Sequence, residues 1–306
     1  MICTIPELNQ AVHVGGWIPD LPDIRDHVFT THPSAQKFFK SAFGIVDAVE
    51  GNKTLPDKAD LSKWDTSVKN QGQIGSCTAN AVAYAAANIN IHYKDIHVDP
   101  ARLFLYYNSR WMIGYLGHEG STIRTTFAAG RLLGAPPEVN YPYEPVKENI
   151  EPPQVVYAMA QNYQFASYAK LSDPNLTFDK WIIAMKATIA SGLPVVGGTV
   201  VYQSFLSAKV AKTGKVPLPA FTEKVVGGHA ICFVGYDDSM VIKSNNKYFP
   251  ESKGAFKFIN SWGMNWGDNG YGYLPYDFVK FGMVSDIWTL YDMEWVDVIK
   301  QFQSPY

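Results

Sequence analysis

Residues 77–92 read CTANAVAYAAANINIH, a run that is rich in alanine and has no acidic or basic side chain apart from its terminal histidine. Such a run predicts a helix that is buried on most of its sides. Ser76 stands directly before it and is a candidate N-cap residue, which would place Cys77 in the first helical turn. With 306 residues the chain is long enough to surround such a helix with a substantial core.

The rest of the chain divides into a helical part and a strand-rich part. Further helices are expected at 100–114, 121–133 and 178–191. Beyond Leu193 the sequence pattern becomes typical of strands. Segments such as PVVGGTVV, HAICFVGYD and AFKFINSW either alternate apolar and polar residues or are continuously apolar, and turn residues separate them. This order predicts an α+β chain with two lobes.

Residues 1–54 are interrupted by proline and glycine, as in GGWIPDLPDIRD, and contain one short apolar patch, KFFKSAFGIV. They are expected to form an extension without a core of its own. Two hypotheses remain open for it: it either covers the functional groove or forms a structural belt around the β-rich lobe.

Composition excludes several classes of function. The net charge is −2 and no basic stripe is present, so nucleic acid is not an expected partner. No apolar run reaches the ~20 residues that span a bilayer, and the N-terminus lacks the pattern of a signal peptide. Membrane insertion is therefore not expected. The compartment stays open between the cytoplasm and secretion without a signal peptide, and the oligomeric state stays open as well.

The cysteines and acidic residues do not predict a cofactor. Cys3, Cys77 and Cys232 are too few for a disulfide framework, and no C-x-x-C pair suggests a metal site. Asp237 and Asp238 lack the spacing of a calcium loop. We expect neither a metal ion nor another cofactor.

One set of residues could carry nucleophilic chemistry. A thiol reacts as its thiolate, and a helix N-terminus or a neighbouring imidazolium lowers its pKa. Cys77 is expected at such a helix start. His229, in VGGHAICFVGY, could lie at an open groove after two glycines, and a histidine needs a partner to fix its tautomer. Asn260, which ends an apolar strand beside Trp262, is a suitable partner.

Three blocks of the sequence, in the order Cys, His, Asn, resemble those of the papain family of cysteine peptidases: NQGQIGSC ending at Cys77, GGHA around His229 and NSWGMNWGDNGYG from Asn260. LPDKADL from Leu55 and YPY at 141–143 are similar to two further landmarks of that family. The resemblance covers about residues 55–290. It implies a peptidase domain over 55–306, with a helical lobe at about 68–145 that carries the catalytic helix and a β-barrel-like lobe at about 146–306.

The resemblance also implies a role for each matching residue. Cys77 would be the nucleophile and His229 the general base and acid, with Asn260 holding the imidazole. Gln71 and the backbone N–H of Cys77 would stabilise the oxyanion. Trp262 would cover the contact between His229 and Asn260 at the edge of the substrate site, with Trp266 packed behind it. The substrate, a peptide or protein, would contact a glycine- and hydroxyl-rich set: Gly120, Ser121, Thr122, Gly197, Gly227 and Gly228.

Two positions depart from the family pattern. Thr78 follows the nucleophile where the family has an aromatic residue, and Glu119 replaces the first glycine of a pair. The implied activity is peptide hydrolysis through a thioester, with the N-terminal extension possible as a zymogen-type inhibitor. Two alternatives remain: a Cys-dependent acyl transferase or isopeptidase on the same fold, and an inactive papain-like binding module.

Overall fold

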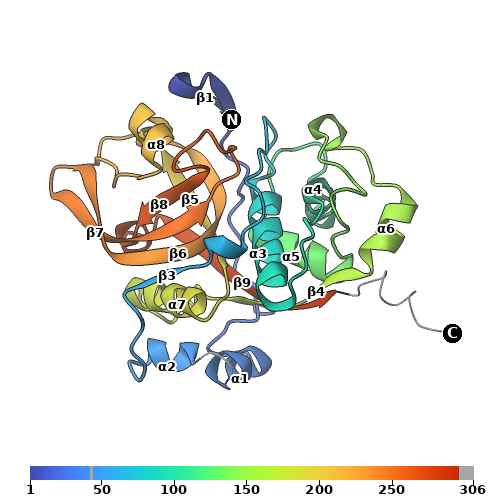
Figure 1. Cartoon of the computed structure of the whole chain (residues 1–306), viewed down its shortest axis with the longest axis horizontal. Helices are drawn as coiled ribbons and strands as arrows, with labels where there is room; N and C mark the ends of the chain where they lie inside the picture. The colour runs from blue at the N-terminus through green and yellow to red at the C-terminus, as the bar shows by residue number, and fades with distance from the viewer. Residues whose placement is uncertain (42–43, 296–306) are drawn as a thin grey trace.

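The computed structural model describes residues 1–41 and 44–295, and residues 296–306, which the sequence analysis assigned to the peptidase domain, lie outside that range. Figure 1 shows a helix-rich half on the right, a strand-rich half on the left, and the N-terminal residues running past both. The α+β class and the two lobes predicted from the sequence are confirmed.

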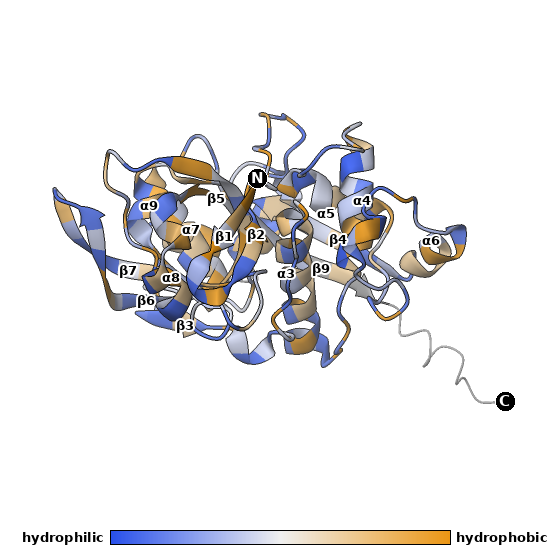
Figure 2. Ribbon diagram, turned by 90° about the horizontal axis from the view of Figure 1, so that it is seen from above, coloured by the Kyte–Doolittle hydropathy of each residue, from blue (hydrophilic) through white to orange (hydrophobic). Residues whose placement is uncertain are grey.

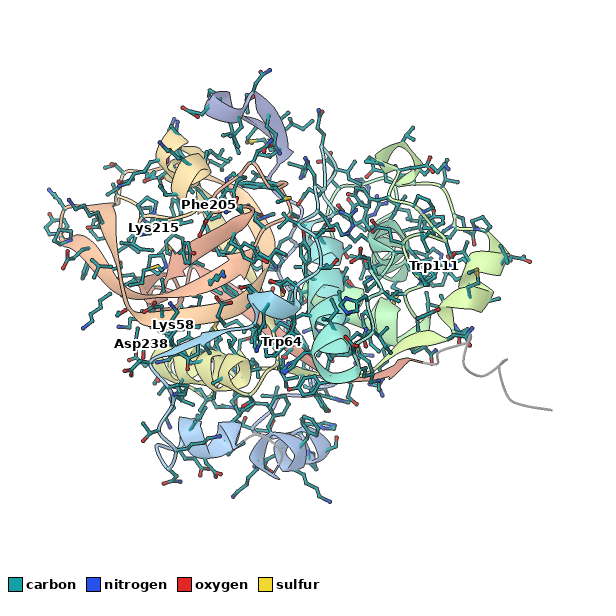
Figure 3. All side chains as sticks on the ribbon, viewed as in Figure 1. Lys58, Trp64, Trp111, Phe205, Lys215 and Asp238 are labelled. Atoms are coloured by element: carbon teal, nitrogen blue, oxygen red, sulfur yellow. The ribbon has the colours of Figure 1, made fainter. Side chains whose placement is uncertain are left out.

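Helix α3 stands at the boundary between the two halves (Figure 1). It begins at Cys77, as the alanine-rich run predicts, and its first fourteen residues are all buried. Ser76 occupies the N-cap position, but its hydroxyl contacts Tyr143 (2.6 Å) and Asn80 (3.1 Å) in place of a backbone N–H of the helix. At the other end His92 stacks on Trp64, with 3.5 Å between ring centroids, and Figure 3 shows Trp64 beside this helix.

The helical half agrees with the predicted segments to within a few residues, because its apolar side chains recur at helical spacing. Trp111, labelled in the helical half in Figure 3, is exposed. Its elements are η2 (Ser62–Trp64), α3 (Cys77–Lys94), α4 (Arg102–Met112), α5 (Ile123–Leu132), η3 (Pro145–Lys147) and α6 (Gln154–Ala160).

The strand-rich half is built on a seven-stranded sheet in the order β4-β9-β5-β6-β7-β8, with β3 paired to β6. Within the described residues, neighbouring strands of this sheet pair antiparallel. The sequence predicted a barrel-like lobe; in the described residues the path of strands stays open at β4 and β8, so the lobe is not a closed barrel. Its elements are β3 (Lys58–Asp60), β4 (Tyr163–Lys170), α7 (Phe178–Ala190), β5 (Val195–Tyr202), η4 (Gln203–Leu206), α8 (Ala208–Thr213), β6 (Val225–Asn246), β7 (Phe249–Ile259), β8 (Tyr271–Pro275), α9 (Tyr276–Lys280) and β9 (Val284–Trp295).

The N-terminal extension consists of a hairpin, a crossing segment and two short helices. In Figures 1 and 2 the hairpin of β1 and β2 lies near the boundary of the two halves, and in Figure 1 α1 and α2 lie at the opposite end of the molecule, below α7. Residues 14–32 connect these two ends. The elements are β1 (Ile2–Ile5), η1 (Pro6–Leu8), β2 (Gln10–His13), α1 (Pro33–Ser41) and α2 (Ile45–Val49).

The second part of the extension packs onto the strand-rich half. The backbone N–H of Phe29 donates to the carbonyl of Lys170 on β4 (3.1 Å), and Phe39 meets the ring of Tyr291 on β9 edge-on. Phe29, Phe39 and Ile45 are fully buried. These residues belong to the main hydrophobic core, so this part of the extension packs into the core of the rest of the chain. No helix in the described part of the chain is long and apolar enough to span a membrane.

Candidate active site

The imidazole of His229 and the amide of Asn260 form the centre of the candidate site. His229 lies on β6, opposite Thr199 of β5, and Asn260 follows the last residue of β7. The Nε2 of His229 lies 2.8 Å from the Oδ1 of Asn260, and both side chains are fully buried. Because Oδ1 can only accept, Nε2 carries the proton and Nδ1 is left with a free lone pair.

Trp262 covers this pair. Its ring stacks on His229 at 4.9 Å between centroids, and Trp266 packs against it edge-on at 5.4 Å. Phe205, labelled in Figure 3 within the strand-rich half, contacts both indoles. This aromatic cluster excludes water from the contact between His229 and Asn260, which strengthens the hydrogen bond by lowering the local dielectric.

Cys77 lies beside the histidine strand. Helix α3 packs against β6, and the backbone N–H of Ala230, the residue after His229, is near the sulfur. The Nδ1 of His229 is buried and makes no hydrogen bond to any described group. The sulfur is also fully buried, and this burial raises the pKa of the thiol to about 12, against the opposing effect of nearby backbone N–H groups.

The electrostatics of this pair differ from the sequence-based expectation. A helix N-terminus and an imidazolium were expected to lower the pKa of Cys77. Burial instead raises it, and burial also lowers the pKa of His229 to about 4, outweighing the Asn260 hydrogen bond. These shifts correspond to a neutral thiol at Cys77 and a neutral imidazole at His229 near pH 7.

Gln71 is held in place by the residues around Asn260 and the YPY segment. Its Nε2 donates to the carbonyl of Ile74 (3.0 Å), and its Oε1 accepts from the hydroxyl of Ser261 (2.5 Å). Its backbone carbonyl accepts from the hydroxyl of Tyr143 (2.9 Å). Sequence reasoning gave Ser261 and Tyr143 no role here; their only signals were the adjacency of Ser261 to Asn260 and the YPY pattern.

Two backbone contacts join the loop before Cys77 to the residues after Asn260. The N–H of Gln71 donates to the carbonyl of Ser261 (2.8 Å), and Asn70 forms an antiparallel bridge with Trp262. The N–H of Gly263 in turn donates to the carbonyl of Lys69 (3.0 Å). These bonds tie the two lobes together at the site itself.

Residues 15–18 of the extension lie directly over Cys77. The N–H of Gly15 donates to the carbonyl of Gly228 (2.8 Å), and the N–H of Ile18 donates to the carbonyl of Ser121 (2.9 Å). Ser121 returns a bond to the carbonyl of Gly16 (3.0 Å). A Cβ on Gly16 would stand 2.5 Å from the carbonyl oxygen of Gly75 and 2.9 Å from the sulfur of Cys77, so only glycine fits there.

The other predicted substrate residues surround this segment, with one exception. A Cβ at Gly120 would meet the carbonyl of Gly16, and one at Gly227 would meet Val14 and Gly15. Thr122 caps α5 by accepting from the N–H of Thr125. A Cβ at Gly197 would instead point at Phe233, Val284 and Ile287 in the core. The neighbouring Gly198 is the glycine of β5 that faces the extension.

Polar side chains anchor the extension on both sides of Gly16. His13 contacts Glu119 through Nε2 and Oε2 at 2.6 Å, so the glutamate that departs from the family pattern holds the extension. Trp17 donates from Nε1 to Asp286 of β9 (3.1 Å). The pKa of Asp286 is raised to about 6, mainly by burial and to a smaller extent by the negative charge of Asp20. Among the described residues no three His, Cys, Asp or Glu side chains cluster to hold a metal ion.

Comparison with known proteins identifies the family of this chain. Residues 55–287 match the family described as papain family cysteine protease, and the chain belongs to that family. It is therefore a cysteine-type peptidase, a hydrolase.

Individual proteins show how similar the chain is to known sequences and structures. The chain is 35% identical over 290 residues to an uncharacterized peptidase C1-like protein of Acanthamoeba polyphaga mimivirus, covering 91% of this chain and 86% of that protein. It resembles the crystal structure of xylellain, a cysteine protease from Xylella fastidiosa, with a TM-score of 0.72 and 32% identity over 92% of this chain and 96% of that one. Bromelain from Ananas comosus in complex with E64 shares the fold, with a TM-score of 0.54 and 20% identity over 76% of this chain and 98% of that one.

Proposed function

We propose that this chain hydrolyses peptide bonds through a thioester formed on Cys77, and that residues 13–20 of its extension hold it inactive. The observation that carries the first part is the pairing of His229 with Asn260, which leaves Nδ1 of the imidazole free to accept a proton from the thiol. The observation that carries the second is the seat of Gly16 against Cys77.

In the proposed reaction Nδ1 of His229 takes the proton of Cys77 as the sulfur attacks the carbonyl of a peptide or protein substrate. The tetrahedral oxyanion accepts hydrogen bonds from Nε2 of Gln71 and the backbone N–H of Cys77. The imidazolium then gives its proton to the leaving amine, the C–N bond breaks, and a thioester remains. Water, deprotonated by His229, hydrolyses the thioester and restores the thiol.

Asn260 is a positioning residue in this scheme, because it acts through His229. Trp262 shields that contact from water. The backbone of the substrate would replace that of the extension at Gly120, Ser121 and Gly228, with Gly227 and Thr122 beside it; Gly197 would support the site from the core side. Of these, the carbonyl of Gly228 and the backbone N–H and carbonyl of Ser121 are the polar groups that now bind residues 15–18.

The extension would inhibit in two ways. It occupies the position where a substrate would lie, and it keeps water from a nucleophile that must ionise to react. The neutral state of Cys77 and His229 described above is what burial under such a cover produces. Residues 29–41 and 44–49, which pack on the strand-rich half, would play a structural part, so the belt and the cover would be different sections of one extension.

Because the extension has a structural section as well as a covering section, deleting it whole is a poor test of inhibition. Removing residues 1–54 would also uncover the core that Phe29, Phe39 and Ile45 complete, so a point substitution is sharper. Gly16→Ala adds one methyl group where the Gly75 carbonyl and the Cys77 sulfur leave no room. Leu21→Ala, at a side chain 79% exposed in the same segment, is the matched control.

Gly16→Ala is expected to react faster with a thiol-alkylating epoxide at Cys77 and to cleave peptides faster than Leu21→Ala. Adding Cys77→Ala to the Gly16→Ala chain should abolish cleavage, whereas adding Cys3→Ser should not. Equal labelling of the Gly16→Ala and Leu21→Ala chains would contradict inhibition by the extension. Undiminished cleavage by the Cys77→Ala chain would contradict the nucleophile.

A further inference from the structure

Trp17 of the extension occupies an enclosed pocket beside the nucleophile. Only 9% of its surface is exposed, although it lies in a segment with no regular helix or strand of its own. The residue before it, Gly16, abuts the sulfur of Cys77, and Trp17 itself forms a parallel bridge with Ser121. The pocket that holds Trp17 therefore adjoins Cys77, the proposed nucleophile.

The wall of the pocket is flat because two glycines form it. A Cβ on Gly198 of β5 would lie 2.0 Å from Cε2 of the indole and 2.3 Å from Cζ2. A Cβ on Gly228 of β6 would lie 2.7 Å from Cε3. An alanine at either position would overlap the ring, so this site accepts a broad planar group only because both residues lack a side chain.

A buried carboxylate closes the pocket. Oδ2 of Asp286 accepts from Nε1 of Trp17 at 3.1 Å and from the backbone N–H of Asp20 at 2.7 Å. Asp286 is only 7% exposed and is held at a φ of 49°, in the left-handed region that is costly for a residue with a Cβ. Both donors to Asp286 belong to the extension and leave with it.

We propose, building on the function proposed above, that this pocket of Gly198, Gly228 and Asp286 selects substrates with a planar, N–H-donating side chain near the scissile bond, namely tryptophan or arginine. The two glycines favour a flat group. The carboxylate, which loses two hydrogen bonds when the extension leaves, favours a donor that restores them, because a buried acceptor without a donor is costly. Arginine offers a planar fork and a complementary charge, and tryptophan repeats the present contact.

The intact chain offers a test that does not depend on catalysis. In Trp17→Arg, Trp17→Phe and Trp17→Leu chains, the rate of alkylation at Cys77, followed by peptide mass mapping of the uncut protein, reports how often the extension leaves. Cys232, buried in the core on β6, is the internal control, because it is labelled only if the protein unfolds.

Labelling of Cys77 should rise roughly tenfold for Trp17→Phe, which keeps the plane but loses the hydrogen bond to a carboxylate, and further for Trp17→Leu. Trp17→Arg should stay close to the parent chain. Asp286→Asn keeps an oxygen acceptor but no charge, so it should release the Trp17→Arg chain much more than the Trp17 chain. Equal labelling of Cys77 in the parent, Trp17→Phe and Trp17→Leu chains would overturn the proposed pocket. So would an Asp286→Asn change that raises labelling equally in the parent and Trp17→Arg chains.

A second arm uses the Gly16→Ala chain and a peptide library in which tryptophan, arginine, phenylalanine and leucine compete at each position around the cleaved bond. Preference for tryptophan and arginine at one position, with the arginine preference lost in Asp286→Asn, supports the pocket. Cleavage without such a preference overturns the pocket and leaves the proposed function intact. The expected labelling pattern without any cleavage overturns the proposed function and leaves the pocket as a docking site for the extension.

Discussion

Nε2 of His229 and Oδ1 of Asn260 lie 2.8 Å apart in a fully buried contact beneath the indole of Trp262. The amide fixes both the tautomer and the direction of the imidazole, so the ring presents Nδ1 as an acceptor. The Nδ2 of Asn260 makes no hydrogen bond within the described residues. Only the oxygen side of this amide therefore contributes to holding the ring.

Asn260→Ala should lower kcat in the Gly16→Ala chain by roughly 10- to 100-fold and leave KM nearly unchanged. The loss leaves the buried Nε2–H of His229 without an acceptor, which costs about 1–3 kcal/mol. Asn260→Asp keeps an acceptor oxygen and should recover part of the activity while raising the pKa that governs the acid limb of the pH–rate profile. Steady-state kinetics over a pH series checks both, and an Asn260→Ala chain with unchanged kcat would contradict the positioning role.

Gln71→Ala should reduce kcat by about 10²–10³, since one oxyanion donor is worth about 2.7–4 kcal/mol. The same change leaves the hydroxyl of Ser261 without its acceptor, so thermal unfolding should be measured alongside. Gln164→Ala, on the surface of β4, is the control and should leave kcat unchanged. A fall in thermal stability with normal kcat would assign Gln71 a structural role alone.

The pH dependence of Cys77 alkylation should differ between the covered and released chains. Burial raises the pKa of Cys77 to about 12 and lowers that of His229 to about 4. Between these values both groups are neutral, so the parent chain should react slowly, with a rate that rises steadily from pH 5 to pH 9 as the small thiolate fraction grows and with no inflection in that range. Release of the extension by Gly16→Ala readmits water to Cys77. The inflection of the pH–rate profile for alkylation should then lie well below the usual thiol pKa of about 8.5. Identical profiles for the two chains would contradict the role of the cover.

Asp286 should make the folded chain less stable as the pH rises. Its pKa is raised from 3.8 to about 6, so between these values the folded state binds more protons than the unfolded state. Stability from this group is complete below pH 4 and is lost as the pH passes 6, by about 3 kcal/mol in all. The groups facing it are Trp17 and Asp20 on the extension and Lys170 on β4.

Urea unfolding of the parent and the Asp286→Asn chains from pH 4 to pH 8 isolates this contribution. The difference in free energy of unfolding between the two should shift in favour of Asp286→Asn as the pH rises. A difference that does not change with pH would show that Asp286 does not titrate in this range.

Much of the site could be predicted from local sequence. The alanine-rich run specified a buried helix starting at Cys77, and glycines around a lone histidine at a strand marked His229. The register of a strand could not be predicted in the same way. Gly197 and Gly198 are adjacent, and successive residues of a strand face opposite sides, so the sequence offered no means to tell which of them faces the extension.

The ionisation state of Cys77 could not be predicted either. It depends on the complete burial of the sulfur, to which distant segments such as Gly16 of the extension contribute. The support of Gln71 by Ser261 likewise crosses between lobes. Local sequence patterns predict the helices, the strands and the reactive side chains. Contacts between segments distant in the sequence decide which of those side chains are buried, how they are oriented and whether they are charged.

The backbone bonds between Lys69–Gln71 and Ser261–Gly263 have a mechanical consequence. If the lobes part to admit a polypeptide, we expect these bonds to act as a hinge at the proposed site, so that the far rims move while Gln71 and Asn260 keep their spacing. The proposed catalytic residues would then be in place before a substrate binds, and opening the groove would not separate them.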